Sequence, residues 1–316
     1  MSQAQVRVTV VGIGEIGRGW ASMCVAAGWP VTLFDNAADA LEGAAEIVAG
    51  RARALASLER AEEDAVERGI AGLTVGRSLL QACSDAQWII ESIDEDLLAK
   101  QKLFEALESV APNARAVTSS TSGLATKDLA ARCRRPDRVF VTHPLNPPEL
   151  IPLVEVVPGP QTDGALVEVV KGWLRALGRI PVVIKKPVPG NIAGRIAAAV
   201  WREAIDLVLK GVIDVDDLDR AVSLGPALAW AAGGPHLTHQ LAAGDRKLTQ
   251  FIQQLCHDHE ARWADLAGWV KLEPDEQHRL IHAIEAAYAG KTDQIRRARN
   301  RRVAAILRAV EEARTE

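Results

Sequence analysis

The chain has little of what marks secreted, membrane-spanning or nucleic-acid-binding proteins. Its 316 residues include only four cysteines, which stand far apart and form no CxxC pair. This excludes a disulfide framework and favours a cytoplasmic location, with reduced thiols that fill small gaps in the core. No apolar run approaches the ~20 residues that a membrane-spanning helix needs, and the first residues lack a signal-peptide pattern. The formal net charge of −4 argues against nucleic acid as a partner.

What remains is the composition of a folded globular protein. Hydrophobic residues make up 48% and charged residues 25% of the chain, near the average for such domains. Short apolar runs alternate with longer helical patterns up to residue 185, which predicts an α/β fold with a doubly wound, mostly parallel Rossmann-type sheet. The predicted strands are residues 6–11, 31–34, 88–91, 116–119, 139–142, 153–157 and 181–184, and the predicted helices include 20–27, 37–68, 97–110 and 163–177.

The second part of the chain changes character after a proline-rich linker at residues 186–190. Only helical patterns follow, beginning with 192–210 and 215–222. Residues 291–316 combine an apolar stripe with a basic face, which predicts an amphipathic helix. We therefore expect two domains, a sheet domain of residues 1–187 and an all-helical domain of residues 188–316.

A glycine-rich turn follows the first predicted strand with the spacing Gly12-x-Gly14-x-x-Gly17. In this dinucleotide-binding pattern the first glycine makes the turn and the second lets a pyrophosphate approach the backbone. The third lets helix and strand pack closely. The helix that begins here presents free N–H groups to the phosphates. The predicted cofactor-binding residues of the turn are Gly12, Ile13, Gly14, Glu15, Ile16 and Gly17.

An acidic residue, Asp35, ends the second predicted strand 18 residues beyond Gly17. A carboxylate at this place accepts hydrogen bonds from the ribose hydroxyls of NAD and repels the 2′-phosphate of NADP. Because no arginine follows in Asn36-Ala-Ala, we expect NAD as the cofactor. A helix N-cap is the structural alternative for Asp35, and the two roles are compatible.

Two further polar segments, residues 118–124 and 141–155, begin at the ends of consecutive predicted strands. Such strand ends line the ligand crevice of an open α/β sheet. His143 precedes three prolines within five residues, and a stiff loop suits a preorganised base. Glu155 lies 12 residues further on, where it can accept a hydrogen bond from the other imidazole nitrogen. A purely structural histidine is the alternative.

Together these motifs resemble the 3-hydroxyacyl-CoA dehydrogenase superfamily over residues 5–230. The run at 143–155, His-Pro-Leu-Asn-Pro-Pro-Glu-Leu-Ile-Pro-Leu-Val-Glu, is most similar to the free-acid branch, which holds L-gulonate 3-dehydrogenase (lambda-crystallin) and L-carnitine dehydrogenase. The resemblance implies that His143 is the general base, Glu155 its partner and Ser122 a hydrogen-bond donor to the reacting oxygen. It also implies that residues 91–95 and Lys100 border the cofactor. The predicted cofactor-binding residues outside the glycine turn and Asp35 are Glu95, Lys100 and Ser120.

The chain departs from the family at the start of the first C-terminal helix. The family carries Gly-Phe-x-x-Asn-Arg there, and its Asn binds substrate, whereas this chain has Gly-Asn-Ile-Ala-Gly-Arg at 190–195. Gly194 cannot make a side-chain hydrogen bond, so the substrate must be oriented differently, and Asn191 is a candidate replacement. Asn146 is a further candidate substrate residue.

A tryptophan is the last candidate for the substrate site. Residues 224–236 resemble a family loop that reaches the active site, and Trp230 lies in it. With Trp201 it would form an aromatic wall for a quaternary ammonium group, a favourable cation–π arrangement. Packing between helices is the alternative for both side chains.

The charge of residues 36–72 bears on the substrate. This segment holds eight acidic and four basic residues and is a poor docking surface for an anionic coenzyme A. We therefore expect NAD-dependent oxidation of the secondary hydroxyl of a small 3-hydroxy acid, gulonate- or carnitine-like, to the 3-keto acid. The alternatives are a 3-hydroxyacyl-CoA dehydrogenase and a non-catalytic NAD(H)-binding homologue. The scattered histidines form no strong metal motif, so no metal is expected. The resemblance implies an NAD-binding domain at 1–187 and a homodimer built through 188–316.

Overall fold

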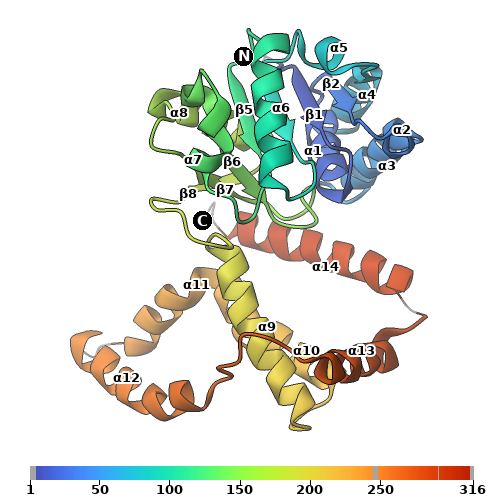
Figure 1. Ribbon diagram of the computed structural model, residues 1–316. Helices are drawn as coiled ribbons and strands as arrows, with labels where there is room; N and C mark the ends of the chain where they lie inside the picture. Colours follow the sequence, from blue (N-terminus) through green and yellow to red (C-terminus); the bar gives the residue numbers. More distant parts are fainter. Residues whose placement is uncertain (1–4, 245–247, 291, 314–316) are drawn as a thin grey trace. The chain divides into compact units, whose positions relative to one another are not determined.

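The computed structural model describes residues 5–244, 248–290 and 292–313. The chain forms two compact units, residues 1–195 and residues 196–316 (Figure 1). The division falls within helix α9 (Ala193–Leu209). The predicted domain boundary near residue 187 stays a prediction.

The first unit contains an eight-stranded sheet in the order β3-β2-β1-β4-β5-β6-β7-β8. All neighbouring strands pair in parallel except β6 and β7, which pair antiparallel. This confirms the predicted doubly wound, mostly parallel sheet. The strands are β1 (Val8–Val11), β2 (Val31–Phe34), β3 (Leu73–Val75), β4 (Trp88–Glu91), β5 (Ala116–Ser119), β6 (Val139–Pro144), β7 (Leu153–Val157) and β8 (Ile180–Val183).

The helices of this unit differ from the sequence prediction in two places. The first begins at Glu15, inside the glycine motif rather than after it, and the predicted helix 37–68 is divided into three. Gly43 and Glu59 cause the breaks because both have positive φ angles, 63° and 58°, which a continuing right-handed helix excludes. The helices are α1 (Glu15–Ala26), α2 (Ala38–Leu41), α3 (Ala44–Ser57), α4 (Glu63–Ala71), α5 (Leu79–Cys83), α6 (Leu97–Val110), α7 (Thr126–Leu129) and α8 (Gly164–Ala176).

Helices cover both faces of the sheet. On one face, Phe104 and Leu107 of α6 pack with Ile89 of β4 in a buried apolar cluster. On the other face, Trp88 of β4 is flanked by two tryptophans from α1 and α8, with ring centroids 5.7 and 5.6 Å away. The Trp88 indole N–H donates to Thr118 Oγ1 at 2.9 Å, which satisfies the polar atom of this buried ring.

Helices are the only regular secondary structure among the described residues of the second unit, as expected. Residues 224–236, expected to be a loop, are helical instead: α10 ends at Leu224 and α11 begins at Pro226, with a kink at Gly234 (φ 76°). No helix among the described residues is both long and apolar enough to cross a membrane. The cytoplasmic location stays a prediction. The helices are α10 (Val215–Leu224), α11 (Pro226–Ala243), α12 (Leu248–Asp265), α13 (Pro274–Tyr288) and α14 (Thr292–Glu312).

The four cysteines differ in environment, which gives a testable prediction. Burial raises the pKa of the Cys24 and Cys83 thiols to about 12, whereas Cys256 is exposed, contrary to the expectation of a core position. The thiolate is the reactive form, so at pH 8 the native protein should react rapidly with Ellman's reagent at Cys256 and not at Cys24 or Cys83. Cys256→Ser should abolish the rapid phase. Rapid labelling of Cys24 or Cys83 in the native protein would contradict this assignment.

Candidate functional site

The three glycines of the turn after β1 have separate structural tasks. Gly12 has φ 94°, and a Cβ there would lie 2.5 Å from the Ser92 backbone. A Cβ on Gly17 would lie 1.9 Å from the Gly12 carbonyl oxygen. Neither position therefore tolerates a side chain, which agrees with the turn and close-packing roles.

Gly14 is different, because a Cβ there would meet nothing within 4 Å. The protein itself does not need a glycine at this position. The open space lies at the N-terminus of α1, for which Gly14 is the N-cap without a side-chain hydrogen bond. A phosphate group can approach bare backbone there and accept from free N–H groups. The glycine turn thus fits a dinucleotide.

Asp35 connects this turn to the end of β2. Its Oδ2 accepts from the Ile13 backbone N–H at 2.7 Å, and its Oδ1 accepts from the Ala37 N–H at 3.0 Å. Each carboxylate oxygen keeps a second lone pair. Asp35 therefore shapes the glycine turn and retains acceptor capacity for ribose hydroxyls.

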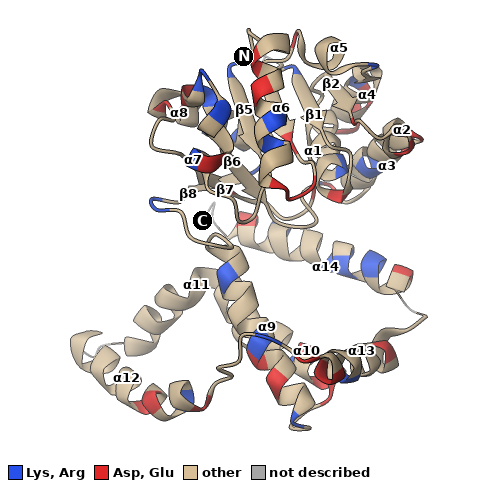
Figure 2. Cartoon of the chain, in the orientation of Figure 1, with Lys and Arg blue, Asp and Glu red and all other residues tan. Residues whose placement is uncertain are grey.

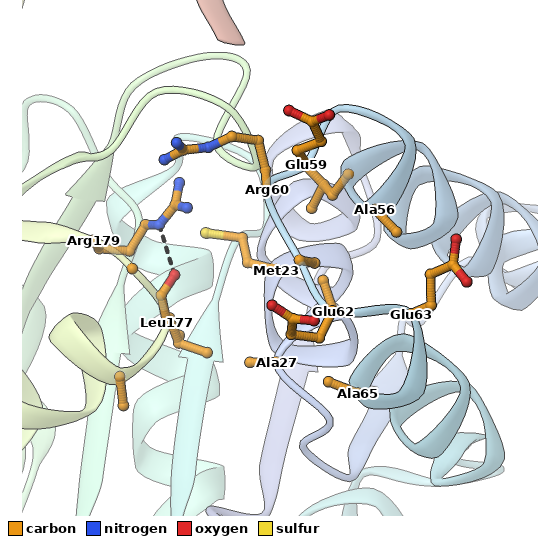
Figure 3. A pocket seen from close by; sticks show the side chains of 15 residues that line it. Met23, Ala27, Ala56, Glu59, Arg60, Glu62, Glu63, Ala65, Leu177 and Arg179 are labelled. Carbon is orange, nitrogen blue, oxygen red and sulfur yellow. Dashed lines mark hydrogen bonds between the residues drawn. The ribbon is translucent and has the colours of Figure 1, made fainter. Parts of the chain in front are cut away.

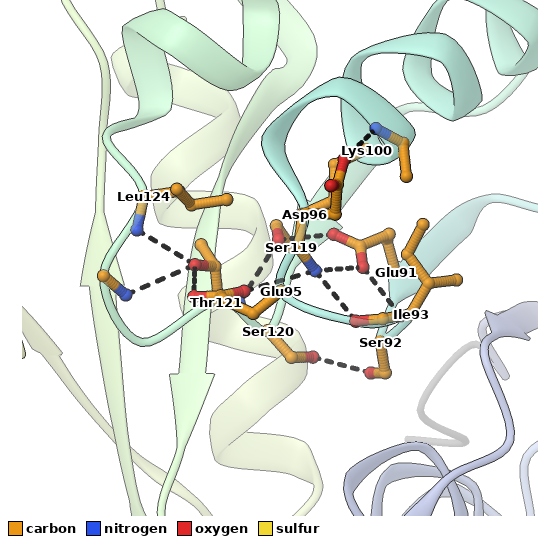
Figure 4. Close-up of polar contacts among 12 residues, drawn as sticks. Glu91, Ser92, Ile93, Glu95, Asp96, Lys100, Ser119, Ser120, Thr121 and Leu124 are labelled. Carbon is orange, nitrogen blue, oxygen red and sulfur yellow. Dashed lines mark hydrogen bonds and ion pairs between the residues drawn. The ribbon is translucent and has the colours of Figure 1, made fainter.

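A buried ion pair lies at the end of β4 (Figure 4). The Lys100 ammonium is 2.6 Å from Glu91 Oε1, and both side chains are almost fully buried. Lys100 also donates to the Ile93 carbonyl oxygen at 3.0 Å and lies 3.5 Å from Glu95. Burial raises the pKa of Glu91, against the opposing effect of Lys100. Because all three lysine donors face protein oxygens, Lys100 acts here as a buried anchor, and its contact with the cofactor stays a prediction.

The segment after β5 carries Ser120 and Ser122. Ser120 Oγ accepts from the Trp20 indole N–H at 3.0 Å and shares a hydrogen bond of 2.8 Å with Ser92 Oγ. Ser122 is exposed on the turn that follows. Ser120 thus joins α1 to the ends of β4 and β5, while Ser122 presents its side chain to solvent.

The structure brings together His143 and Glu155, which are opposite residues in the antiparallel pairing of β6 with β7. His143 Nδ1 is 2.8 Å from Glu155 Oε2, and the other oxygen of Glu155 accepts from the backbone N–H groups of Ile192 and Ala193 at 2.8 and 2.9 Å. The glutamate side chain is 2% exposed and the histidine side chain 14%. Because the Glu155 carboxylate can only accept hydrogen bonds, the His143 Nδ1 that faces it must carry the proton. In this tautomer Nε2 keeps its lone pair.

Contacts far apart in sequence hold the proline-rich loop that follows His143. A Cβ on Gly19 of α1 would lie 2.8 Å from the Pro148 ring. Arg51 of α3 bridges Glu15 at 2.7 Å and Glu149 at 3.5 Å. The loop is thus packed directly against the helix that begins in the glycine turn. Sequence reasoning missed these contacts, and no local pattern signals them.

The predicted substrate residues are placed unequally. Asn146 is exposed on the loop after β6, whereas Asn191 is 6% exposed and has φ 51°. A Cβ on Gly194 would meet nothing within 4 Å, so this position has room for a larger side chain. Trp230 lies in α11 of the second unit, and its place in the site stays a prediction.

A hollow of about 660 Å³ in the first unit contains none of the predicted site residues (Figure 3). It is lined by parts of α1, by the segment between α3 and α4, and by the turn before β8, with Glu59, Glu62 and Glu63 among its side chains. This hollow therefore does not mark the predicted site. Within the described ranges, no group of three or more His, Cys, Asp or Glu side chains is arranged to hold a metal ion.

Two glycine variants test whether the turn after β1 binds a dinucleotide. The backbone of Gly14 (φ −73°, ψ −167°) accepts alanine, so Gly14→Ala should leave the Tm unchanged. Its methyl group should nevertheless weaken NADH binding, measured by fluorescence titration, by about 10-fold or more. Gly17→Ala should instead destabilise the fold by about 1–3 kcal/mol through overpacking. Unchanged NADH affinity in Gly14→Ala would refute the assignment.

Comparison with known proteins places this geometry in a family. The family model for the 3-hydroxyacyl-CoA dehydrogenase NAD-binding domain matches residues 7–187, and the model for the C-terminal domain of the same enzymes matches residues 190–267. An L-carnitine dehydrogenase of Streptomyces griseus is 37% identical over 90% of this chain and 81% of its own length. An L-carnitine dehydrogenase of Streptomyces coelicolor is 35% identical over 96% of this chain and 94% of its own length.

A solved structure extends the likeness to the whole fold. The NAD-dependent 5-formyl-3-hydroxy-2-methylpyridine-4-carboxylic acid 5-dehydrogenase aligns with a TM-score of 0.81 at 27% identity, covering 97% of this chain and 99% of that protein. The resemblance noted in the sequence is thereby confirmed, as is NAD as the cofactor. The chain belongs to the 3-hydroxyacyl-CoA dehydrogenase family and is an NAD-dependent dehydrogenase that acts on a CH–OH group.

Proposed function

We propose that this enzyme oxidises the secondary hydroxyl of a small, carnitine-like 3-hydroxy acid to the 3-keto acid, with His143 as the general base. The observation that carries the proposal is the hydrogen bond between His143 and the buried Glu155 carboxylate at 2.8 Å. It leaves Nε2 as the acceptor for a proton, and the turn of Ser122 follows the neighbouring strand at the same edge of the sheet.

The residues divide the chemistry between them. NAD⁺, when bound, supplies the hydride acceptor at C4 of its nicotinamide ring. His143 Nε2 takes the proton of the substrate hydroxyl as the C–H bond gives up its hydride, and the ring becomes positively charged. Glu155 stabilises that charge and keeps Nδ1 protonated throughout. Ser122 donates a hydrogen bond to the oxygen as its charge changes.

The charge of the segment after β2 and the names of the related proteins both favour a small substrate over an acyl-CoA. Acidic side chains occur along α2, α3 and α4 (Figure 2), including Asp39, Glu46 and Asp64. A negatively charged segment repels the phosphates of coenzyme A and is compatible with a cationic substrate. The relatives named L-carnitine dehydrogenase support a quaternary ammonium group on that substrate.

We also infer that the chain acts as a homodimer through residues 188–316, with an NAD-binding domain that ends near residue 187. Support comes from large apolar side chains exposed on the second unit, such as Trp201 (62%), Leu224 (72%) and Val270 (95%). Exposed apolar area of this kind is typical of surfaces that associate.

The acid–base pair is tested by two substitutions and a control. His143→Gln should lower kcat by about 10²- to 10⁴-fold and leave NADH affinity unchanged, because only the proton acceptor is lost. Glu155→Gln should lower kcat and also the Tm, since an amide cannot accept all three hydrogen bonds. Glu168→Gln, at an exposed carboxylate of α8, serves as the control. Wild-type turnover in His143→Gln would end the assignment.

A panel of substrates tests the proposed specificity, with NADH formation as the readout. L-carnitine should be oxidised faster than 4-amino-3-hydroxybutyrate, which lacks only the three methyl groups, and faster than L-gulonate or 3-hydroxybutyryl-CoA. Gly194→Asn restores the family side chain in open space and should shift the kcat/KM ratio toward the acyl-CoA by about 10-fold or more. Tight NADH binding without turnover of any compound would favour the non-catalytic alternative.

A further inference from the structure

Glu91 is a buried carboxylate that the proposed chemistry does not use. It ends β4, is 0% exposed and stands opposite Ser119 in the pairing of β4 with β5. Placing a charge in such a position is costly unless its partners compensate. The hydrogen-bond partners of Glu91 therefore indicate which part of the structure this carboxylate holds in place.

The two oxygens of Glu91 have different partners. Oε1 accepts from Lys100 Nζ at 2.6 Å and from the Ile93 backbone N–H at 2.8 Å. Oε2 accepts from the Ser119 hydroxyl. One oxygen thus belongs to the ion pair, and the other extends from β4 to the last residue of β5.

From Ser119 the hydrogen bonds continue around the turn that presents Ser122 (Figure 4). Ser119 Oγ accepts from the Thr121 backbone N–H at 3.2 Å. The Thr121 hydroxyl donates to Glu95 and accepts from the N–H groups of Gly123 and Leu124, at 3.3 and 3.0 Å. The residues on both sides of Ser122 are therefore fixed, and Ser122 itself projects from a rigid turn.

We infer that Glu91 is a positioning residue, which sets the place of Ser122 through Ser119 and Thr121. The inference rests on the proposed role of Ser122 in the reaction. The competing explanation is that Glu91 only neutralises Lys100. If so, removing Glu91 would destabilise the fold by leaving the Lys100 charge buried without its partner, but removing Ser119 would leave turnover unchanged. A relay to the turn must lose turnover when either Glu91 or Ser119 is removed.

Three variants separate these explanations. Glu91→Gln keeps the shape but presents an amide N–H₂ to Ser119 Oγ, which already accepts from Thr121. Ser119→Ala cuts the relay and leaves the Glu91–Lys100 pair intact. Thr9→Val is the matched control, because it removes a buried hydroxyl that donates to the Ala82 carbonyl oxygen, a contact outside the relay.

The variants should differ in kcat. Glu91→Gln and Ser119→Ala should each lower kcat by about 10- to 100-fold, by displacing a donor to the reacting oxygen. The Kd of Ser119→Ala for NADH should stay within about 2-fold of wild type, because this variant leaves Lys100 paired with Glu91. Thr9→Val should lower only the Tm. A wild-type kcat in Ser119→Ala, or a loss confined to NADH affinity, would overturn the inference.

A double-mutant cycle shows whether Glu91 acts through Ser122. In a Ser122→Ala background, Glu91→Gln should lower kcat by less than about 2-fold, because the group it positions is already absent. Independent losses that multiply would overturn the inference, since they would show a general structural effect.

Amide hydrogen exchange supplies a readout that needs no substrate. Exchange at Gly123 and Leu124 should become faster in Glu91→Gln and Ser119→Ala and stay unchanged in Thr9→Val. If the wild-type enzyme oxidised none of the hydroxy acids, the proposed function would fail while this experiment still tested the relay. Unchanged exchange at both amides would overturn the inference.

Discussion

The candidate site depends on the hydrogen bonds that the buried Glu155 carboxylate accepts. One oxygen binds His143, and the other accepts from the backbone N–H groups of Ile192, just before α9, and of Ala193, its first residue. Leaving a buried hydrogen-bonding group without its partner costs about 1–3 kcal/mol, a noticeable share of the ~5–15 kcal/mol that stabilises an ordinary domain. The orientation of the imidazole is therefore built into the fold and does not depend on a bound substrate.

The reversal of β7 creates this arrangement. In the parallel part of the sheet, successive strands bring only their carboxyl ends to one edge, and these ends carry the glycine turn and the segment of Ser122. Because β7 runs antiparallel to β6, residues near its beginning lie opposite residues near the end of β6. Glu155 thereby reaches the same edge as the polar strand ends, and a helix that begins beyond β8 supplies its remaining donors.

Much of the fold was accessible from the sequence because apolar runs mark buried strands. β3 was missed, since its three residues are half exposed and lack that signal. The acid–base pair was predicted because each residue falls on a recognisable strand pattern. The contacts of Gly19 and Arg51 with the proline-rich loop were not, because they join residues that only tertiary packing brings together. Lys100 was predicted to touch the cofactor. Its ion pair with Glu91, nine residues earlier, was missed because a helical pattern does not show which partner a lysine takes.

Glu155 binds residues 192 and 193 only through their backbone N–H groups. The side chains of these two residues therefore contribute nothing to these hydrogen bonds. These side chains can therefore change without disturbing the orientation of His143, the proposed base. Position 194 follows these two residues directly, and a Cβ there would meet nothing within 4 Å. A substitution at 194 should therefore cost little folding stability. A change at position 194 can thus alter which molecules fit while the pairing of His143 with Glu155 stays intact, so substrate choice and the proposed proton transfer rest on separate parts of the chain.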